Sequence, residues 1–125
     1  MKKHTFKYDL DNPLRTVEHR NLILEKSYLK KTYIDWYNRI IKHLPVNVEG
    51  IKLEIGSGGG FLPEILPDVV TSDILELDYC DYCFSAEKLP FEDESLSAIM
   101  MVNVLHHIPT PELFFKEADR CLKKG

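Results

Sequence analysis

Long apolar runs are missing from the sequence: none approaches the roughly 18 residues that a helix needs to cross a bilayer. The start, Met1 to His4, leads into polar sequence rather than into the apolar core of a signal peptide. Internal repeats and low-complexity tracts are missing as well. These absences predict one domain that works in the cytoplasm without contact with a membrane.

Positive charge is also scarce. The chain has 16 Lys and Arg against 20 Asp and Glu, which gives a formal net charge of -4 and a pI near 5.7. A nucleic-acid-binding face needs clustered Lys and Arg to neutralise phosphates. The composition therefore argues against nucleic acid as a partner and predicts a small molecule or a protein instead.

Cysteine is too sparse for a disulfide framework, because Cys80, Cys83 and Cys121 make an odd count. Cys80 and Cys83 have the CxxC spacing found in zinc sites. However, the sequence offers no second pair or nearby His to complete a ligand set, and a strand would point the two side chains to opposite faces. We expect reduced cysteines with a packing role and no metal site.

What the chain does contain is an ordinary globular composition, with 44% hydrophobic and 29% charged residues. From about His19 to Leu44, apolar residues recur at intervals of three, four and seven, which predicts one face of a long helix. Pro45 ends this pattern. The segment before it, with Asn12 and Pro13, is predicted to be an irregular arm.

The remainder alternates strand and helix patterns. Only Ile74 to Tyr79 separate the second predicted strand (69–73) from the third (80–84), which is fewer residues than a helical crossover needs. Either the third strand is therefore very short or its crossover is a bare loop. The last helix is expected to turn Leu113, Phe114, Ala118 and either Cys121 or Leu122 inward. In chain order we expect a strand at 51–55, a glycine turn, a short helix at 61–66, strands at 69–73, 80–84 and 98–104, and a helix from Thr110 or Pro111 to Leu122. This order is typical of an α/β protein.

The glycine turn, Glu54-Ile55-Gly56-Ser57-Gly58-Gly59-Gly60, is the most informative stretch. Glycines between a strand and a helix let the backbone approach a ligand closely. A nicotinamide dinucleotide fingerprint would need glycine where the chain has Phe61, and the Gly-Lys-Ser or Gly-Lys-Thr ending of a P-loop is absent. A flexible glycine-rich loop without a ligand is the alternative.

Three blocks in the chain resemble motifs of class I S-adenosylmethionine (SAM)-dependent methyltransferases, in the type 11 group. They are the glycine turn, Ala86-Glu87-Lys88-Leu89-Pro90-Phe91, and Asn103-Val104-Leu105-His106-His107-Ile108. The resemblance covers about 51–125. It implies a three-layer α/β Rossmann-like fold with an N-terminal helix, divided into an arm and cap helix (1–46) and a partial SAM-binding core (47–125).

The resemblance also implies a set of cofactor-binding residues. Asp73 would hydrogen-bond the ribose hydroxyls, although a turn or helix-cap acid is the alternative. Glu54 would lie under the glycine turn or face the ammonium group of SAM, unless it is only the solvent-side residue of its strand. The implied set is Glu54, Gly56, Ser57, Gly58, Gly60, Asp73, Ile74, Ser85, Ala86, Glu87 and Asn103.

At Ser85 the chain departs from the family, which often has an acid that accepts a hydrogen bond from the adenine amino group. A neutral serine should bind adenine less strongly than a carboxylate. His106 and His107 are candidates for substrate contact or for a general base, with loop packing as the alternative. The aromatic residues Tyr28, Tyr33, Trp36 and Tyr37 could shield the sulfonium, but aromatic residues at helical spacing more often belong to a core. Arg20 is a weak candidate for contact with an anionic substrate.

The resemblance thus predicts transfer of a methyl group from SAM to a small-molecule nucleophile, with S-adenosylhomocysteine (SAH) as product. The segment Leu122-Lys123-Lys124-Gly125 is similar to the family's Leu-Lys-Pro-Gly turn, after which three more strands normally follow; strands one to four are present and the last strands are missing. A non-catalytic SAM-binding remnant, or a fragment acting only with a partner, is therefore the alternative, and a nicotinamide-dependent dehydrogenase is a third. An exposed fourth strand also predicts a homodimer paired through it, or low solubility.

Overall fold

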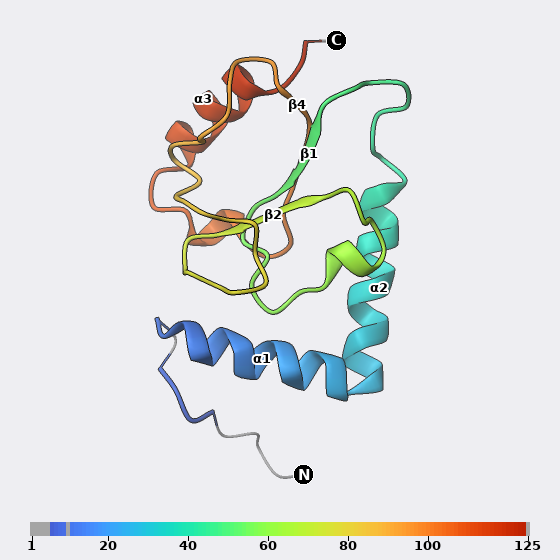
Figure 1. The fold of residues 1–125 in the computed structure, drawn as a ribbon, viewed down its shortest axis with the longest axis vertical. Coiled ribbons are helices and arrows are strands. Elements are labelled where there is room, and N and C mark those ends of the chain that lie inside the picture. Colours follow the sequence, from blue (N-terminus) through green and yellow to red (C-terminus); the bar gives the residue numbers. More distant parts are fainter. Residues whose placement is uncertain (1–5, 10, 125) are drawn as a thin grey trace.

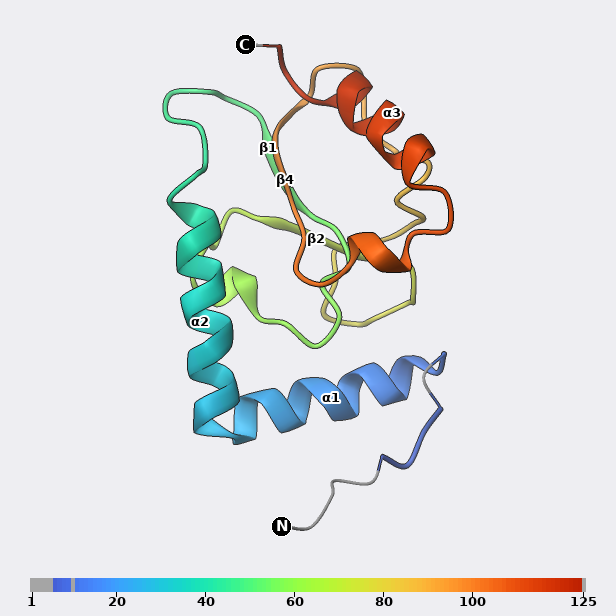
Figure 2. The same ribbon diagram turned by 180° about the vertical axis from the view of Figure 1, so that it is seen from behind.

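The computed structural model describes residues 6–9 and 11–124, which form four parallel strands between helices (Figure 1). Two elements of the sequence argument, the start at Met1 to His4 and the terminal Gly125, lie outside these residues. Helix α3 covers one side of the sheet and helix α2 the other, so the molecule has three layers in both views (Figures 1 and 2). Among the described residues, no helix is long and apolar enough to span a membrane.

The predicted long N-terminal helix is wrong, because two helices occupy its place. Helix α1 spans Pro13–Glu25 and helix α2 spans Ser27–Ile41, with the extended residue Lys26 between them. The predicted arm at Asn12 and Pro13 instead begins α1, since the Asn12 side chain accepts a hydrogen bond from Leu14 N at 2.9 Å. The break lets α2 pack on the sheet while α1 turns across its end (Figure 2).

The sheet has the order β3-β2-β1-β4 and is parallel throughout. Its strands are β1 (Ile51–Glu54), β2 (Val70–Asp73), β3 (Tyr82–Cys83) and β4 (Leu96–Met100). The third strand has two residues and follows β2 through a loop, so both expectations for that crossover are confirmed. Because all four strands run the same way, their carboxyl ends meet at one edge of the sheet.

The fourth strand begins two residues earlier and ends four residues earlier than its apolar pattern predicts. After Met100 the chain leaves the sheet, and Asn103 adopts a left-handed conformation with φ 57°. Met101 and Val104 nevertheless pack against the cluster under α3, and Val102 packs against the cluster under α2. The apolar run therefore reflects burial of a loop as well as of a strand.

Two apolar clusters fill the spaces on either side of the sheet. One lies under α3 (Pro111–Cys121), which buries Phe114, Ala118 and Cys121 as predicted, while Leu113 is 44% exposed and that prediction is wrong. The other joins α1 and α2 to the sheet through Ile23 and Tyr37. It also contains Leu62 of the short 3-10 helix η1 (Leu62–Glu64), which lies within the short helix expected at 61–66.

Strand β4 lies at the edge of the sheet, beside the segment that follows α3. Leu122 forms an isolated parallel bridge with Leu96, and Lys123 N donates to Leu96 O at 2.9 Å. The start of β4 is therefore paired on both sides. The loop before β4 is held to α3 by Arg120, whose guanidinium donates to the carboxylate of Glu117 and to the carbonyl oxygens of Leu89 and Phe91.

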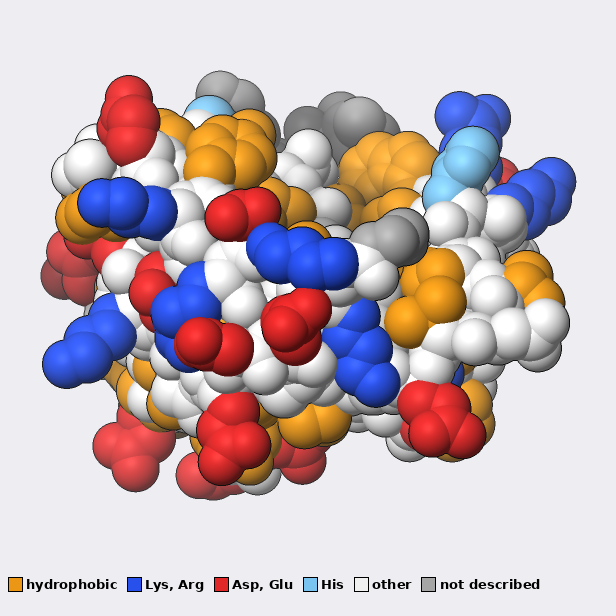
Figure 3. Space-filling view, turned by 90° about the horizontal axis from the view of Figure 1, so that it is seen from above, with side chains coloured by type: hydrophobic (Ala, Val, Ile, Leu, Met, Phe, Trp, Pro, Cys, Tyr) orange, Lys and Arg blue, Asp and Glu red, His pale blue; other side chains and the backbone are white. Residues whose placement is uncertain are grey.

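On the face seen from above, acidic and basic side chains are interspersed, with apolar side chains between them (Figure 3). This mixed pattern agrees with the small net charge. Helix α1 crosses beneath the carboxyl ends of the strands (Figure 1). The cavity described below lies there, between the strand ends and α1.

Candidate functional site

The glycine loop follows β1 and needs glycine for steric reasons. Gly56 and Gly58 have φ of 66° and 50°, a region that side chains other than glycine rarely adopt. A Cβ atom on Gly56 would lie 2.4 Å from Cγ2 of Val104. The backbone of the loop can therefore pass directly beside the segment that follows β4.

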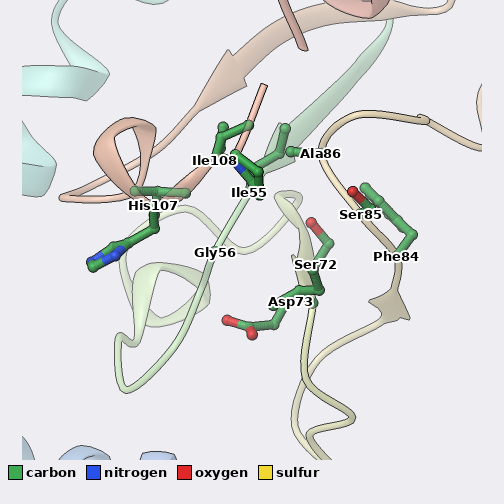
Figure 4. A pocket seen from close by; sticks show the side chains of 12 residues that line it. Ile55, Gly56, Ser72, Asp73, Phe84, Ser85, Ala86, His107 and Ile108 are labelled. Atoms are coloured by element: carbon green, nitrogen blue, oxygen red, sulfur yellow. The ribbon is translucent and has the colours of Figure 1, made fainter. Parts of the chain in front are cut away.

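Asp73 ends β2 and ties that strand to the glycine loop. Its Oδ2 accepts from Gly58 N at 2.8 Å, and its Oδ1 accepts from Leu75 N at 3.0 Å. The side chain is nearly buried, and it projects toward the glycine loop (Figure 4). Because an ionised carboxylate has about four acceptor sites, the turn contacts leave Asp73 able to accept further hydrogen bonds.

Glu54 is the last residue of β1 and is 3% exposed, so the interpretation of it as a solvent-side residue is wrong. Ser57 Oγ donates to its Oε1 at 2.6 Å, and Ser72 Oγ donates to its main-chain oxygen at 2.7 Å. Burial raises the pKa of the Glu54 carboxyl to about 7, with the Ser57 hydrogen bond lowering it and the charge of Asp73 raising it. A carboxyl group that titrates near neutral pH thus lies at the base of the glycine loop.

The raised pKa of Glu54 predicts a pH-dependent stability. Between pH 4.5 and 7 the folded protein keeps a proton that the unfolded chain releases, so the free energy of unfolding falls as the pH rises. The stabilising contribution is complete below about 4.5 and lost above about 7. We expect a fall on the order of 2 kcal/mol in the wild type that Glu54→Gln does not show, measured by urea unfolding across this pH range.

The control for this prediction is Glu49→Gln, because Glu49 is an exposed residue just before β1. Its pH profile should follow that of the wild type. Parallel profiles for the wild type and Glu54→Gln would instead mean that Glu54 is already ionised in the folded protein at pH 5.

A cavity of about 440 Å³ opens at the carboxyl ends of the strands, within the size range of small-molecule sites. Its walls come from the glycine loop, the end of β2, the segment after β4 and both N-terminal helices. A smaller cavity of about 90 Å³ adjoins it. The two share Gly56, Asp73, Ile74, Val104 and His107, so they form one continuous cleft.

The smaller cavity lies beside the segment after β3 (Figure 4). Ser85 and Ala86 line it, together with Phe84 and with Ile74, which is 67% exposed. The Ser85 hydroxyl accepts from Glu87 N at 3.2 Å. Glu87 lines neither cavity; its Oε1 accepts from Thr110 N at 2.9 Å, where α3 begins.

The segment after β4 contributes Asn103 and one of the two histidines. Asn103 is exposed and lines the main cavity. His107 lies in the 3-10 helix η2 (Leu105–His107) and lines both cavities, whereas His106 lines neither. The two imidazole rings are 3.9 Å apart between centroids. Among the described residues, no group of three or more His, Cys, Asp or Glu could hold a metal ion.

The N-terminal helices supply site residues that sequence reasoning missed or left undecided. Thr16 and His19 of α1 line the main cavity without having been singled out, and Tyr33 and Tyr37 of α2 line it from the aromatic stretch. Partial burial and then the charge of Arg15 lower the pKa of His19, although its imidazole stays accessible to solvent. The break at Lys26, which brings α1 under the sheet, has no proline or glycine to reveal it in the sequence.

The cysteines lie outside the main cavity and are free thiols. Cys121 is buried under α3, and Cys83 is exposed on β3. Burial raises the pKa of the Cys80 thiol to about 11, and the charge of Asp73 raises it as well. The thiol of Cys80 is therefore protonated at neutral pH and is a poor nucleophile.

Residues 53–125 match the model of a family described as "Methyltransferase domain". No curated protein matches the chain significantly. Among solved structures, a protein of Thermotoga maritima named as a SAM-dependent methyltransferase and possible histamine N-methyltransferase is 28% identical over 74% of this chain, with a TM-score of 0.58.

Two further structures are similar in fold. A protein of Methanococcus maripaludis named as an S-adenosyl-L-methionine-dependent methyltransferase is 16% identical over 98% of the chain, with a TM-score of 0.71. One of Anabaena variabilis, named as a methyltransferase from an antibiotic biosynthesis pathway, is 20% identical over 72%, with a TM-score of 0.56. The chain covers 47%, 64% and 42% of the three proteins, about half of their length.

Proposed function

The chain belongs to the methyltransferase domain family, and from that premise we propose that it binds SAM in the cleft and transfers the methyl group to a small-molecule nucleophile. The observation that carries the proposal is the continuous cleft at the carboxyl ends of β1, β2 and β4, with the glycine loop and Asp73 on its wall. The protein of Thermotoga maritima is named as a possible histamine N-methyltransferase, and histamine is a small molecule. That name supports a small-molecule acceptor.

The residues of the cleft fit SAM. The left-handed glycines at 56 and 58 keep Cβ atoms away from the loop, and the nearby Glu54 carboxyl suits an ammonium group. Asp73 retains acceptor sites for ribose hydroxyls, and the small cavity between Phe84, Ser85 and Ala86 suits a flat base. We propose that residues 1–46 cover this site and residues 47–125 bind the cofactor.

In the proposed reaction, bound SAM supplies an activated methyl group, and the chain supplies position and shelter from water. Helix α1, with Thr16 and His19, closes the cavity from below the strand ends. Of the two candidate histidines, His107 is the better placed to accept the proton of the acceptor on an imidazole nitrogen, because His106 lines neither cavity. No covalent enzyme group is required.

Titration calorimetry with SAM, SAH and NAD tests the proposal. We expect micromolar binding of SAM and SAH and no binding of NAD. Binding of NAD without SAM would overturn it. If SAM binds but no acceptor from a panel of small amines, phenols and thiols is methylated, the alternative of a non-catalytic binding protein is favoured.

Ser85→Asp is expected to tighten SAH binding by roughly five- to tenfold, because a carboxylate makes a stronger, charge-assisted hydrogen bond with the adenine amino group. An aspartate can keep the turn contact with Glu87 N that the serine hydroxyl makes. Ser27→Asp, on the exposed first turn of α2, controls for the added charge. If both variants bind SAH with equal affinity, the adenine does not lie beside Ser85.

We also propose that two copies pair through the outer edge of β4, beyond its first residue. The strand lies at the edge of the sheet, and residues 96–100 contain neither a charge nor a proline to oppose pairing. Sedimentation over a concentration series should show a dimer that Met101→Lys, directly after β4, weakens in a variant that stays folded, while Leu105→Lys on the exposed following turn does not. A monomer at high concentration with slowly exchanging β4 amides would contradict the pairing.

A cytoplasmic location is part of the same proposal. Its support is the chemistry of the three cysteines, which are free thiols as expected in a reducing compartment.

A further inference from the structure

Two side chains that do not line the proposed cofactor cleft donate hydrogen bonds to carbonyl oxygens of the glycine loop. Arg20 of α1 donates through Nη1 to Gly60 O, and Tyr79 Oη donates to Gly58 O at 2.6 Å. The Arg20 guanidinium also lies over the Tyr79 ring, 4.3 Å from its centroid. A cation–π contact therefore joins the two side chains that hydrogen-bond the loop.

Arg20 and Tyr79 make these contacts from outside the cleft that would hold the ligand, since neither residue lines either of its two cavities. They line a third cavity of about 140 Å³, which shares Glu54, Ser57 and Gly60 with the main one. Neither residue is thus placed to touch the cofactor. Contact between Arg20 and an anionic substrate stays a prediction.

Helix α1 touches the loop with its backbone too. A Cβ atom on Gly59 would lie 3.0 Å from Arg20 N and 3.1 Å from Arg20 Cα. The preceding residue, His19, lines the main cavity together with Thr16. Helix α1 therefore contributes residues to the main cavity and also a hydrogen-bond donor to the glycine loop.

The Tyr79 hydroxyl keeps its hydrogen at physiological pH, and the Arg20 side chain presents several N–H donors in one plane. Burial raises the pKa of Tyr79 to about 12, and the charge of Arg20 lowers it only in part. The bonds to the loop carbonyls are therefore present over the whole pH range in which the protein would work.

We propose that Arg20 and Tyr79 are positioning residues that hold the carbonyl groups of Gly58 and Gly60 toward the protein and so set the ligand-facing backbone before the cofactor binds. The inference rests on the proposed function. Glycine loops lose much conformational freedom when they are ordered, so a loop ordered in advance binds its ligand more tightly. Helix α1 is then a determinant of cofactor affinity rather than a cover alone.

The test uses Arg20→Met, which keeps the length and packing of the side chain but removes the donor, and Tyr79→Phe, which removes only the hydroxyl. We expect the Kd for SAH to rise roughly tenfold and fivefold, respectively. The effect of the double variant should be smaller than the product of the two, because both donors hold the same loop. Arg20→Lys should restore part of the affinity, since it keeps a charged donor.

A second measurement needs no ligand. Hydrogen exchange of the amides at 56–61 should become faster in Arg20→Met and Tyr79→Phe, while the melting temperature changes little. Arg39→Met and Tyr28→Phe, at exposed positions of α2, are matched controls and should leave both Kd and exchange unchanged.

The outcomes separate the two proposals. A wild-type protein that binds no SAH overturns the proposed function. A wild-type protein that binds SAH, with variants that stay folded and keep its affinity within twofold, overturns the positioning role. Variants with a lower melting temperature but an unchanged Kd and unchanged loop exchange would assign Arg20 and Tyr79 to stability alone, which also overturns it.

Discussion

Asp73→Ala is expected to weaken SAH binding by about 2–4 kcal/mol, or between one and three powers of ten in Kd. The loss has two sources. The carboxylate can accept the ribose hydroxyls, and it already holds Gly58 N at 2.8 Å, so its removal takes away a ligand contact and loosens the glycine loop. Titration calorimetry on the folded variant measures the combined loss.

Asp73→Asn separates these two contributions. An asparagine can still accept from Gly58 N or Leu75 N through its single oxygen, but it lacks the charge and the second acceptor that paired hydroxyls need. We expect an intermediate loss of affinity for Asn, and none for the control Glu76→Gln at an exposed position of the following loop. If Asp73→Ala folds and binds SAH as tightly as the wild type, Asp73 is only a turn residue and the cofactor lies elsewhere.

Gly60→Ala is expected to lower the free energy of unfolding by about 3 kcal/mol, because overpacking a buried site is destabilising. The added Cβ atom would lie 2.2 Å from Oη of Tyr37, whose side chain is 1% exposed and unable to move into solvent. Urea unfolding measures the loss. In contrast, a Cβ atom on Gly58 meets only Gly56 O at 3.7 Å, so Gly58→Ala should cost about 1–2 kcal/mol for its left-handed backbone alone.

A second substitution tests the cause of the Gly60 effect. Tyr37→Phe removes the clashing oxygen and leaves Cζ at 3.5 Å from the added Cβ atom, at the cost of the hydrogen bond from Phe61 N. The double variant Gly60→Ala/Tyr37→Phe should therefore be more stable than Gly60→Ala alone. Additive losses from the two substitutions would show that the collision with Tyr37 is not the reason.

Local patterns predicted the elements that local physics controls. The change from alternating apolar residues to glycines marked the end of β1 and the loop, and Asp73 was identified as the acid that ends β2. The short helix at 61–66 was predicted without its 3-10 type, and the early end of β4 was not predicted, because the same apolar residues fill a core whether they lie in a helix, a strand or a buried loop. Leu113 was misassigned for a related reason. The spacing of apolar residues in α3 allows either of two neighbouring faces to be buried, and the buried face is the one that contains Phe114.

The candidate site divides in the same way. Its glycines, Asp73, Ser85 and Asn103 follow from motifs that are contiguous in the chain, and all of them line the cleft. Thr16 and His19 reach the cleft only because the chain breaks at Lys26, and Arg20 and Tyr79 meet only in the folded protein. Contacts across 21 and 40 residues of chain leave no periodic signal in a single sequence.

The sequence by itself determined the family, the order of strands and helices along the chain after residue 50, and the glycine turn, because each depends on residue types at short, fixed spacings. Only the tertiary structure decided which side chains hydrogen-bond the carbonyl oxygens of that turn and which histidine lines the cavity. It also buries Glu54, which raises the pKa of that carboxyl to about 7. These properties depend on burial and on neighbours distant in the chain. A carboxyl group has its ordinary pKa until the folded protein removes its water.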